Sequence, residues 1–146
     1  MARIDKDKYY LKIAETVAQR STCLKRRYGC VLVKNDEIIA TGYNGSARGE
    51  VNCCDQYLEC PRKNIPHNSG NYADCPAVHA EQNAMLSASR SEMIGSTMYL
   101  AGFDSNGDAI EGCEPCPICK RMIKNSGIKM IITCGFISSG NGRRLI

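Results

Sequence analysis

Residues 29–43 read Gly29-Cys-Val-Leu-Val-Lys-Asn-Asp-Glu-Ile-Ile-Ala-Thr-Gly-Tyr43, two apolar runs separated by a short polar segment. Apolar runs rich in β-branched residues that flank Asn and Asp are typical of a β-hairpin. We therefore predict two antiparallel strands, over 29–34 and 38–43, joined by a turn at 35–37. The remaining elements are predicted outward from this hairpin.

Helix and strand signals alternate on both sides of the hairpin. Two prolines stand where the first turn of a helix tolerates them, and a glycine supplies a stop signal. In chain order the predicted elements are a helix from Asp5 to about Arg20, the hairpin, a helix over 77–90 after Pro76, a strand over 97–101, a helix from Pro115 to Gly127, and a strand over 129–134. The order αββαβαβ predicts an α/β fold, a three-layer α-β-α sandwich with a mixed sheet between helices.

Length and composition favour one folded domain over residues 1–146. Hydrophobic residues make up 43% of the chain and charged residues 23%, values that exclude a disordered or fibrous protein. The longest apolar runs are far shorter than a membrane span, and we expect neither membrane insertion nor export. The formal charge of +4 favours a small anionic ligand over a nucleic acid.

The ten cysteines are the unusual feature of the composition. Without a recognisable signal peptide, a disulfide framework is the weaker explanation. In a reducing cytoplasm, which is the location we expect, such cysteines are metal ligands or small core residues. The strand cysteines Cys30 and Cys134 are predicted to be buried core residues.

Two short motifs place metal-ligand side chains at predicted helix starts. One is His79-Ala80-Glu81, and the other is Pro115-Cys116-Pro117-Ile118-Cys119. Two thiolates and one imidazole make a site whose fourth tetrahedral position stays open, the arrangement of catalytic zinc. The order and spacing match the His-x-Glu and Pro-Cys-x-x-Cys signature of zinc deaminases. We predict that His79, Cys116 and Cys119 bind a catalytic zinc.

Glu81 is the spare carboxylate beside this predicted site. It can accept a proton from the attacking water, deliver it to a ring nitrogen and later help to protonate the departing ammonia. That cycle is the hydrolytic deamination of an amidine-like base. Because residues two apart on a helix do not share a face, His79 and Glu81 can both serve the site only if the helix meets it end-on. A Cys-x-x-Cys motif alone would fit a redox pair or half of a structural zinc site equally well.

Five motifs resemble those of deoxycytidylate deaminases, a branch of the cytidine deaminase superfamily. They are Thr22-Cys-Leu-Lys-Arg-Arg, Thr41-Gly-Tyr-Asn-Gly-Ser, Asn52-Cys-Cys-Asp, His79-Ala-Glu-Gln-Asn-Ala and Pro115-Cys-Pro-Ile-Cys. The resemblance covers about residues 5–135. It implies a cytidine deaminase-like fold and conversion of dCMP to dUMP for thymidylate synthesis, with zinc on the His and the two Cys and with Glu81 as proton shuttle.

The resemblance also implies a substrate contact and an assembly. Asn44 is expected to bind the sugar or the phosphate, and family members often form hexamers that dCTP activates and dTTP inhibits. We therefore expect a homo-oligomer. The sequence departs from the family pattern at Ala47, where proline is common, and at Glu111-Gly-Cys-Glu, which replaces a Thr-containing approach to Pro115. These departures concern the rim of the substrate site.

The segment 44–75 is rich in Gly, Asn, Pro and Cys and has no hydrophobic period, so burial alone cannot order it. A closed structural zinc site could do so. Related deaminases carry a second zinc in this region, which implies ligands among four cysteines, with Cys54 or His67 as substitutes. The four are Cys23, Cys53, Cys60 and Cys75. The alternative is that these cysteines are small buried hydrophobic residues.

A nucleoside monophosphate needs at least one fixed cation, and Arg suits bidentate contact with phosphate. Lys25-Arg26-Arg27, Arg48 and Arg121 are the candidates. We predict that Arg26 and Arg121 bind the phosphate. The small residues of Gly42-Tyr-Asn-Gly45 are expected to let the backbone approach a ligand.

Two other functions remain open at the level of sequence. The chain could deaminate another base, such as guanine or adenosine in transfer RNA, or it could be a non-catalytic zinc module that mediates interactions. Glu81 argues against the module, because a closed structural site has no use for a free carboxylate. The Gly42–Gly45 motif and the absence of a concentrated basic surface argue against the other bases.

Overall fold

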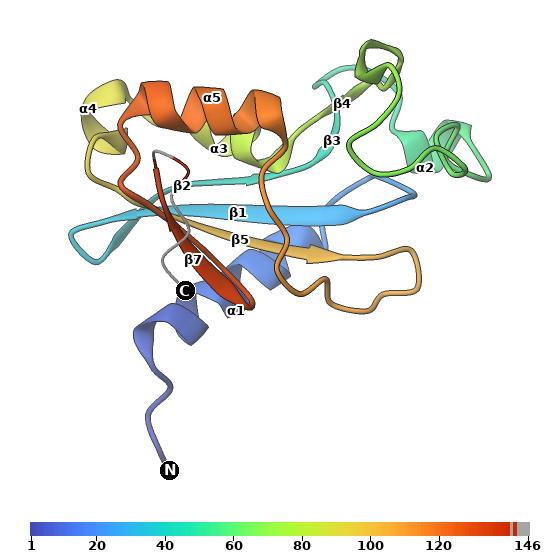
Figure 1. The fold of residues 1–146 in the computed structure, drawn as a ribbon. Coiled ribbons are helices and arrows are strands. Elements are labelled where there is room, and N and C mark those ends of the chain that lie inside the picture. Colours follow the sequence, from blue (N-terminus) through green and yellow to red (C-terminus); the bar gives the residue numbers. More distant parts are fainter. Residues whose placement is uncertain (141, 143–146) are drawn as a thin grey trace.

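The computed structural model describes residues 1–140 and 142 and contains a five-stranded mixed sheet with helices on both faces (Figure 1). The strand order is β2-β1-β5-β6-β7, with β5 and β6 parallel and the other neighbours antiparallel. The strands are β1 (Arg27–Lys34), β2 (Glu37–Tyr43), β5 (Thr97–Phe103), β6 (Met130–Thr133) and β7 (Phe136–Ser139). The predicted three-layer sandwich is confirmed.

The helices divide between the two faces of the sheet. One face carries α1 (Lys6–Ala18), and the opposite face carries α3 (Ala80–Leu86), α4 (Arg90–Met93) and α5 (Pro117–Ser126) (Figure 1). Each face has its own apolar cluster, one around Leu32, Leu100 and Ile123 and one around Val31 and Tyr99. The alternation of β1 side chains between the two clusters is the period of a strand that is buried on both faces.

The hairpin turn is shorter than the sequence predicts. Asn35 and Asp36 have φ angles of 52° and 62°, so these two residues alone make the turn, and Glu37 already belongs to β2. Positive φ at both central positions is the geometry of a type I′ turn, which Asn and Asp tolerate. The strands of the hairpin pair as predicted.

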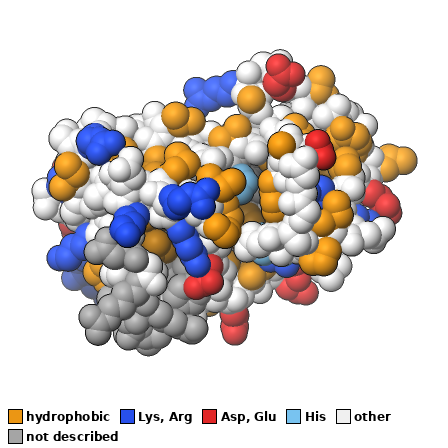
Figure 2. Space-filling view, turned by 45° about the horizontal axis from the view of Figure 1, so that its top comes forward, with side chains coloured by type: hydrophobic (Ala, Val, Ile, Leu, Met, Phe, Trp, Pro, Cys, Tyr) orange, Lys and Arg blue, Asp and Glu red, His pale blue; other side chains and the backbone are white. Residues whose placement is uncertain are grey.

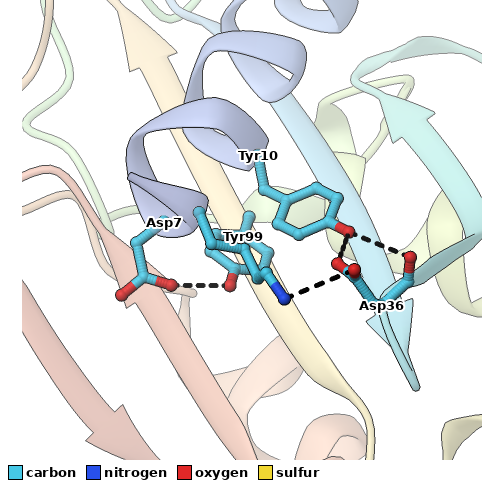
Figure 3. A network of polar contacts seen from close by, with 5 residues as sticks. Asp7, Tyr10, Asp36 and Tyr99 are labelled. Carbon is cyan, nitrogen blue, oxygen red and sulfur yellow. Dashed lines mark hydrogen bonds and ion pairs between the residues drawn. The ribbon is translucent and has the colours of Figure 1, made fainter. Parts of the chain in front are cut away.

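A polar network fastens α1 to the face of the sheet (Figure 3). The Tyr10 hydroxyl donates to Oδ1 of Asp36 at 2.6 Å, and the Tyr99 hydroxyl donates to Oδ1 of Asp7 at 2.7 Å. Lys6 pairs with Asp36 at 3.3 Å. Gly29 of β1 allows α1 to lie close to the sheet, because a Cβ at position 29 would lie 2.0 Å from the carbonyl oxygen of Ala14 in α1.

Two predicted helix starts are wrong. Ala77 and Val78 form the short strand β4 and not a helical turn, so α3 begins only at Ala80. The C-terminal helix α5 begins at Pro117 and not at Pro115. In both cases the predicted proline lies outside the helix. The residue directly before the helix is instead a metal-ligand candidate, His79 for α3 and Cys116 for α5.

The segment 44–75 contains little regular structure, as predicted. Its elements are β3 (Gly45–Ser46), α2 (Cys53–Gln56) and the 3₁₀ turn η1 (Tyr72–Asp74), and β3 pairs with β4 (Ala77–Val78) in a separate two-stranded sheet. This insert lies beside the start of α3 at one end of the molecule (Figure 1).

The C-terminal part differs from the prediction in two ways. Strand β7 was not predicted, and β6 ends at Thr133, one residue before Cys134. Cys134 is therefore exposed and not a core residue, whereas Cys30 is fully buried as predicted. Among residues 1–140 and 142, every helix is too short or too polar to cross a bilayer.

Candidate metal centre and substrate cavity

The structure brings His79, Cys116 and Cys119 together. The Nδ1 atom of His79 lies 3.4 Å from each of the two cysteine sulfur atoms, and the three atoms lie within 4.8 Å of one another. Ligands at zinc distances of about 2.3 Å for sulfur and about 2.0 Å for nitrogen are roughly 3.5 Å apart in a tetrahedron. The three side chains therefore fit a tetrahedral zinc ion, and Nδ1 is the histidine atom that faces it.

Each ligand motif stands at the N-terminal end of a helix. His79 is the residue that precedes α3, with extended backbone (φ −74°, ψ 153°), and its N–H donates to Oε1 of Gln82. Cys116 is the corresponding residue of α5, and its sulfur accepts from the N–H of Cys119 at 3.4 Å. Because His79 lies just outside the helix, the spacing rule for two helical residues does not apply, and α3 meets the site end-on.

The thiols are prepared for a cation. A hydrogen bond from the Cys119 thiol lowers the pKa of Cys116 to about 3, and the same bond raises the pKa of Cys119. The hydrogen bond to Cys116 raises the pKa of His79. The bond between the two thiols thus favours the thiolate form of Cys116, and a cation bound to both sulfur atoms would displace the remaining proton.

Glu81 lies at the same place but is buried, with 5% of its surface exposed. Burial raises the pKa of its carboxyl, which is also hydrogen-bonded to Cys119. A carboxyl whose pKa is raised by burial holds a proton more readily than an exposed carboxyl does. Its position next to the metal-ligand cluster agrees with the acid–base role that the sequence predicts, and that role stays a prediction.

A cavity opens over these residues, and its walls come from segments that are far apart in the sequence. In Figure 2 histidine, coloured pale blue, is visible in a hollow between hydrophobic side chains. The lining includes the predicted site residues His79, Glu81, Cys116, Asn44, Arg26, Cys23, Cys60 and Cys75. Tyr28 forms part of the wall as well, and its hydroxyl accepts from Nη1 of Arg26 at 3.4 Å.

Asn44 lines the cavity, but its side chain is engaged with the protein. Its Oδ1 accepts from Ser21 Oγ at 2.6 Å and from the Tyr28 N–H at 2.8 Å, while Nδ2 donates to the Arg26 carbonyl at 2.9 Å. These bonds hold the segment that leads into β1. Contact of Asn44 with a substrate stays a prediction.

The arginines predicted to bind phosphate lie in different places. Arg26 is half-buried in the cavity wall. Arg121 is exposed on α5 and is not part of that wall, and Arg48 lines a separate groove beside Gly42. The structure therefore offers Arg26, and not Arg121, a direct path to a ligand in the cavity.

The sulfur atoms of the four cysteines predicted to hold a second zinc do not cluster as closely as the ligand atoms of His79, Cys116 and Cys119. Cys53 is buried, and burial is the main cause that raises the pKa of its thiol. The nearby thiols of Cys23, Cys75 and Cys60 raise this pKa further. No three of these four sulfur atoms lie within 4.8 Å of one another, a test that covers residues 1–140 and 142. Cys54, the chain neighbour of Cys53, is exposed.

Sequence reasoning missed Arg62 and Tyr72 of the cavity wall, and it considered Lys25 only as a candidate for phosphate binding. Arg62 is only 7% exposed, and its guanidinium carbon lies 4.0 Å from the centre of the Tyr72 ring. These residues lie in or next to a segment without hydrophobic period, so no pattern marks them. A long cationic side chain in an otherwise irregular insert was the only available signal.

The motif Gly42-Tyr-Asn-Gly45 was expected to let backbone approach a ligand. Gly42 instead allows α3 to lie on β2, because a Cβ there would come 2.4 Å from the amide nitrogen of Ala84 and 2.5 Å from the carbonyl oxygen of Ala80. The glycine thus serves helix–strand packing.

Comparison with known proteins agrees with this geometry. Residues 4–134 match the family described as the cytidine and deoxycytidylate deaminase zinc-binding region. The deoxycytidylate deaminase of Mycobacterium phage D29 is 37% identical over 134 residues, which are 90% of this chain and 96% of the phage protein. That of Schizosaccharomyces pombe is 41% identical over 86% of this chain but over only 36% of its own length, so this chain spans about a third of the yeast protein.

A solved structure is similar as well. The crystal structure of dCMP deaminase from the cyanophage S-TIM5 in complex with dCMP and dUMP has a TM-score of 0.63 and 28% sequence identity, and the match covers 91% of this chain and 83% of the cyanophage protein. The structural similarity thus extends over most of the chain, and the family match over residues 4–134 includes the insert and the metal-ligand motifs.

The ligand geometry generates a prediction about metal content. His79→Ala and Cys116→Ala should each lower the zinc content of purified protein by one ion per chain, because each removes one of three ligands. Elemental analysis measures this loss. Cys134→Ser, which changes an exposed cysteine away from the cluster, is the control and should keep the parent content. Full zinc content in Cys116→Ala would contradict the assignment.

Proposed function

This chain belongs to the cytidine and deoxycytidylate deaminase family, and from that premise we propose that it hydrolyses dCMP to dUMP and ammonia, the supply reaction for thymidylate synthesis. The observation that carries the proposal is the cluster of His79, Cys116 and Cys119 with Glu81 buried beside it in one cavity. The two phage proteins and the yeast protein named above carry the names of deoxycytidylate or dCMP deaminases, which supports this choice of substrate.

His79, Cys116 and Cys119 would hold the zinc ion. When bound, zinc supplies a Lewis acid that makes a water molecule nucleophilic at neutral pH. Two thiolates cancel the charge of the ion, so the site is a weaker Lewis acid than one made of imidazoles alone. The reaction therefore depends on a protein base, and the carboxyl of Glu81 is placed to be that base.

Glu81 moves protons between the water and the pyrimidine. Its carboxylate takes a proton from the attacking water and gives it to the ring nitrogen next to the amino-bearing carbon, which lowers the barrier to addition. It then assists proton transfer to the amino nitrogen, so that ammonia leaves. Burial of Glu81 favours this role, because its raised pKa lets the carboxyl hold the proton between the two steps.

The 5′-phosphate is assigned to the cationic side of the cavity. Lys25 donates to two backbone carbonyls of the insert, whereas the only side-chain acceptor that Arg26 has in the cavity wall, within the described residues, is the Tyr28 hydroxyl. Among the described cations of the cavity wall, the guanidinium of Arg26 therefore has the most donors left for a phosphate. Asn44 supports it through the bond to the Arg26 carbonyl.

We also propose a second, structural zinc ion in the insert, held by Cys23, Cys53, Cys60 and Cys75. Support comes from the gathering of the other three thiols near Cys53, at the base of the insert. All ten cysteines are free thiols, which agrees with metal binding and with a reducing, cytoplasmic location.

Self-association and regulation complete the proposal. Leu86 on α3 and Ile118 and Met122 on α5 are exposed apolar side chains on the same face of the sheet. They favour a homo-oligomer, with a hexamer as the form that the family resemblance implies, and with dCTP and dTTP as effectors. Deamination of another base remains the second candidate, and the substrate comparison described below separates the two.

Glu81→Gln should keep the metal and lose deamination by about 10²- to 10⁴-fold, because the amide has the shape of the carboxyl but cannot take a proton. Ammonia release from dCMP measures the rate, and elemental analysis of the same sample shows that zinc is retained. A variant with near-normal turnover would exclude Glu81 as the proton shuttle.

The wild-type protein should prefer dCMP to deoxycytidine by about 30-fold or more in kcat/KM, since a charge-assisted bond to phosphate contributes roughly 2 kcal/mol and 1.4 kcal/mol is tenfold. Arg26→Ala should reduce this preference to a few-fold by slowing dCMP alone. Arg27→Ala, which changes an exposed neighbour, is the matched control. Equal rates of the wild type on dCMP and deoxycytidine would contradict the substrate assignment, and faster deamination of guanine or of a transfer RNA would favour the second candidate.

The second metal site predicts two zinc ions per chain in fully metallated protein. Cys60→Ser should lose one of them and expose residues 44–75 to faster proteolysis, because the insert lacks an apolar core. Cys54→Ser is the matched control, since Cys54 is exposed in the same segment. A single zinc ion per chain in folded, active protein would contradict the second site and would show that these cysteines serve as small buried residues.

A further inference from the structure

Arg62 lies in the insert and is almost completely buried, with 7% of its surface exposed. Its Nη1 donates to the carbonyl oxygen of Asn71 at 3.1 Å, and its Nη2 donates to that of Ser69. The partners of this buried charge are backbone carbonyls and not carboxylates. Burial of a charged group is costly unless its donors form hydrogen bonds. The guanidinium of Arg62 and the backbone of residues 69–71 therefore hold each other in place.

The same guanidinium fixes an aromatic ring. Its central carbon lies 4.0 Å from the centre of the Tyr72 ring, a cation–π contact. The Tyr72 hydroxyl accepts from the N–H of Asn68 at 2.8 Å, so both the face and the tip of the ring are held by the insert. The ring then meets the imidazole of His79 edge-on, with centroids 6.2 Å apart and planes at 68°.

Lys25 connects this arrangement to the body of the protein. Its ammonium donates to the carbonyl oxygen of Arg62 at 2.8 Å and to that of Ile65. Lys25 belongs to the segment that leads into β1, so its two hydrogen bonds connect the insert to the central sheet. Two cations thus order the wall of the cavity through backbone oxygens, by a means independent of any metal.

We propose that Arg62 is a positioning residue for the metal centre: it holds Tyr72 against His79 and so fixes the plane of the imidazole whose Nδ1 faces both thiols. This role requires a planar group that binds two carbonyls and stacks on a ring at the same time. Lysine offers a compact charge and cannot do both. The activity readouts below rest on the proposed deamination, whereas the metal spectrum does not.

The test uses three variants: Arg62→Lys, Tyr72→Leu and the double variant that carries both changes. Lys63→Ala is the control with which they are compared. Tyr72→Leu removes the ring but keeps the carbonyl bonds of Arg62, which protects the experiment if a change at Arg62 unfolds the insert. Lys63 is the matched control, because it is the exposed neighbour of Arg62 and pairs only with Glu59 among the described residues. Each protein is loaded with Co²⁺ for its absorption spectrum and with Zn²⁺ for kinetics on dCMP and deoxycytidine.

Arg62→Lys and Tyr72→Leu should each shift the Co²⁺ absorption bands and lower kcat by about 10-fold, the size of effect that groups behind a metal ligand produce. The loss should be the same on dCMP and on deoxycytidine. The double variant should lose no more than either single variant, because both act on one element. Lys63→Ala should match the wild type in the spectrum and in the rates.

Three results would overturn the proposal. An Arg62→Lys protein with wild-type rates and spectrum would show that charge alone is enough. A loss confined to dCMP would show that Arg62 contacts the phosphate directly. An unchanged Co²⁺ spectrum in Tyr72→Leu would show that the ring does not orient His79. If the wild type fails to deaminate either substrate, the proposed function is wrong, while the spectra still decide the role of Arg62.

Discussion

The contact between α3 and β2 at Gly42 is the constraint on which the site depends. Two backbones approach there more closely than any side chain allows, since a Cβ on Gly42 would lie 2.4 Å from the amide nitrogen of Ala84. This close approach sets the height of α3 above the sheet. It thereby places His79 just before the helix and Glu81 in the buried first turn of the helix, near the start of α5. A larger residue at position 42 would lift the helix and separate the two halves of the metal centre.

Helix starts supply both the ligands and their electrostatics. His79 and Cys116 occupy the residue before α3 and α5, where backbone conformation is extended and side chains are free of the helical period. The N–H groups of a helix start favour negative charge, and the N–H of Cys119 points at the Cys116 sulfur. This explains why two short motifs far apart in sequence can converge on one point while each keeps ordinary helix geometry.

The sequence predicted the layers of the fold, the hairpin and the metal-ligand set, because hydrophobic period and ligand spacing are local signals. It misplaced the starts of α3 and α5, since Pro76 and Pro115 satisfy the rules for a first turn as well as the true starts do. It missed β7, whose sequence FISS contains only two apolar residues, whereas the equally short β6 reads MIIT. Arg62, and the contact of Lys25 with the insert, escaped detection for another reason: a side chain that binds backbone carbonyls leaves no pattern in the identities of its partners.

The ligand set also has a topological consequence. His79 precedes β5 in the chain, Cys116 and Cys119 follow it, and β5 is the central strand of the sheet. A cation held by both helices therefore cross-links the chain around its central strand. Such an ion is bound by the native arrangement and not by the scattered ligands of the unfolded chain, so its binding free energy adds to that of folding. Metal supply would then set the lifetime of the polypeptide in the cell as well as its catalytic competence.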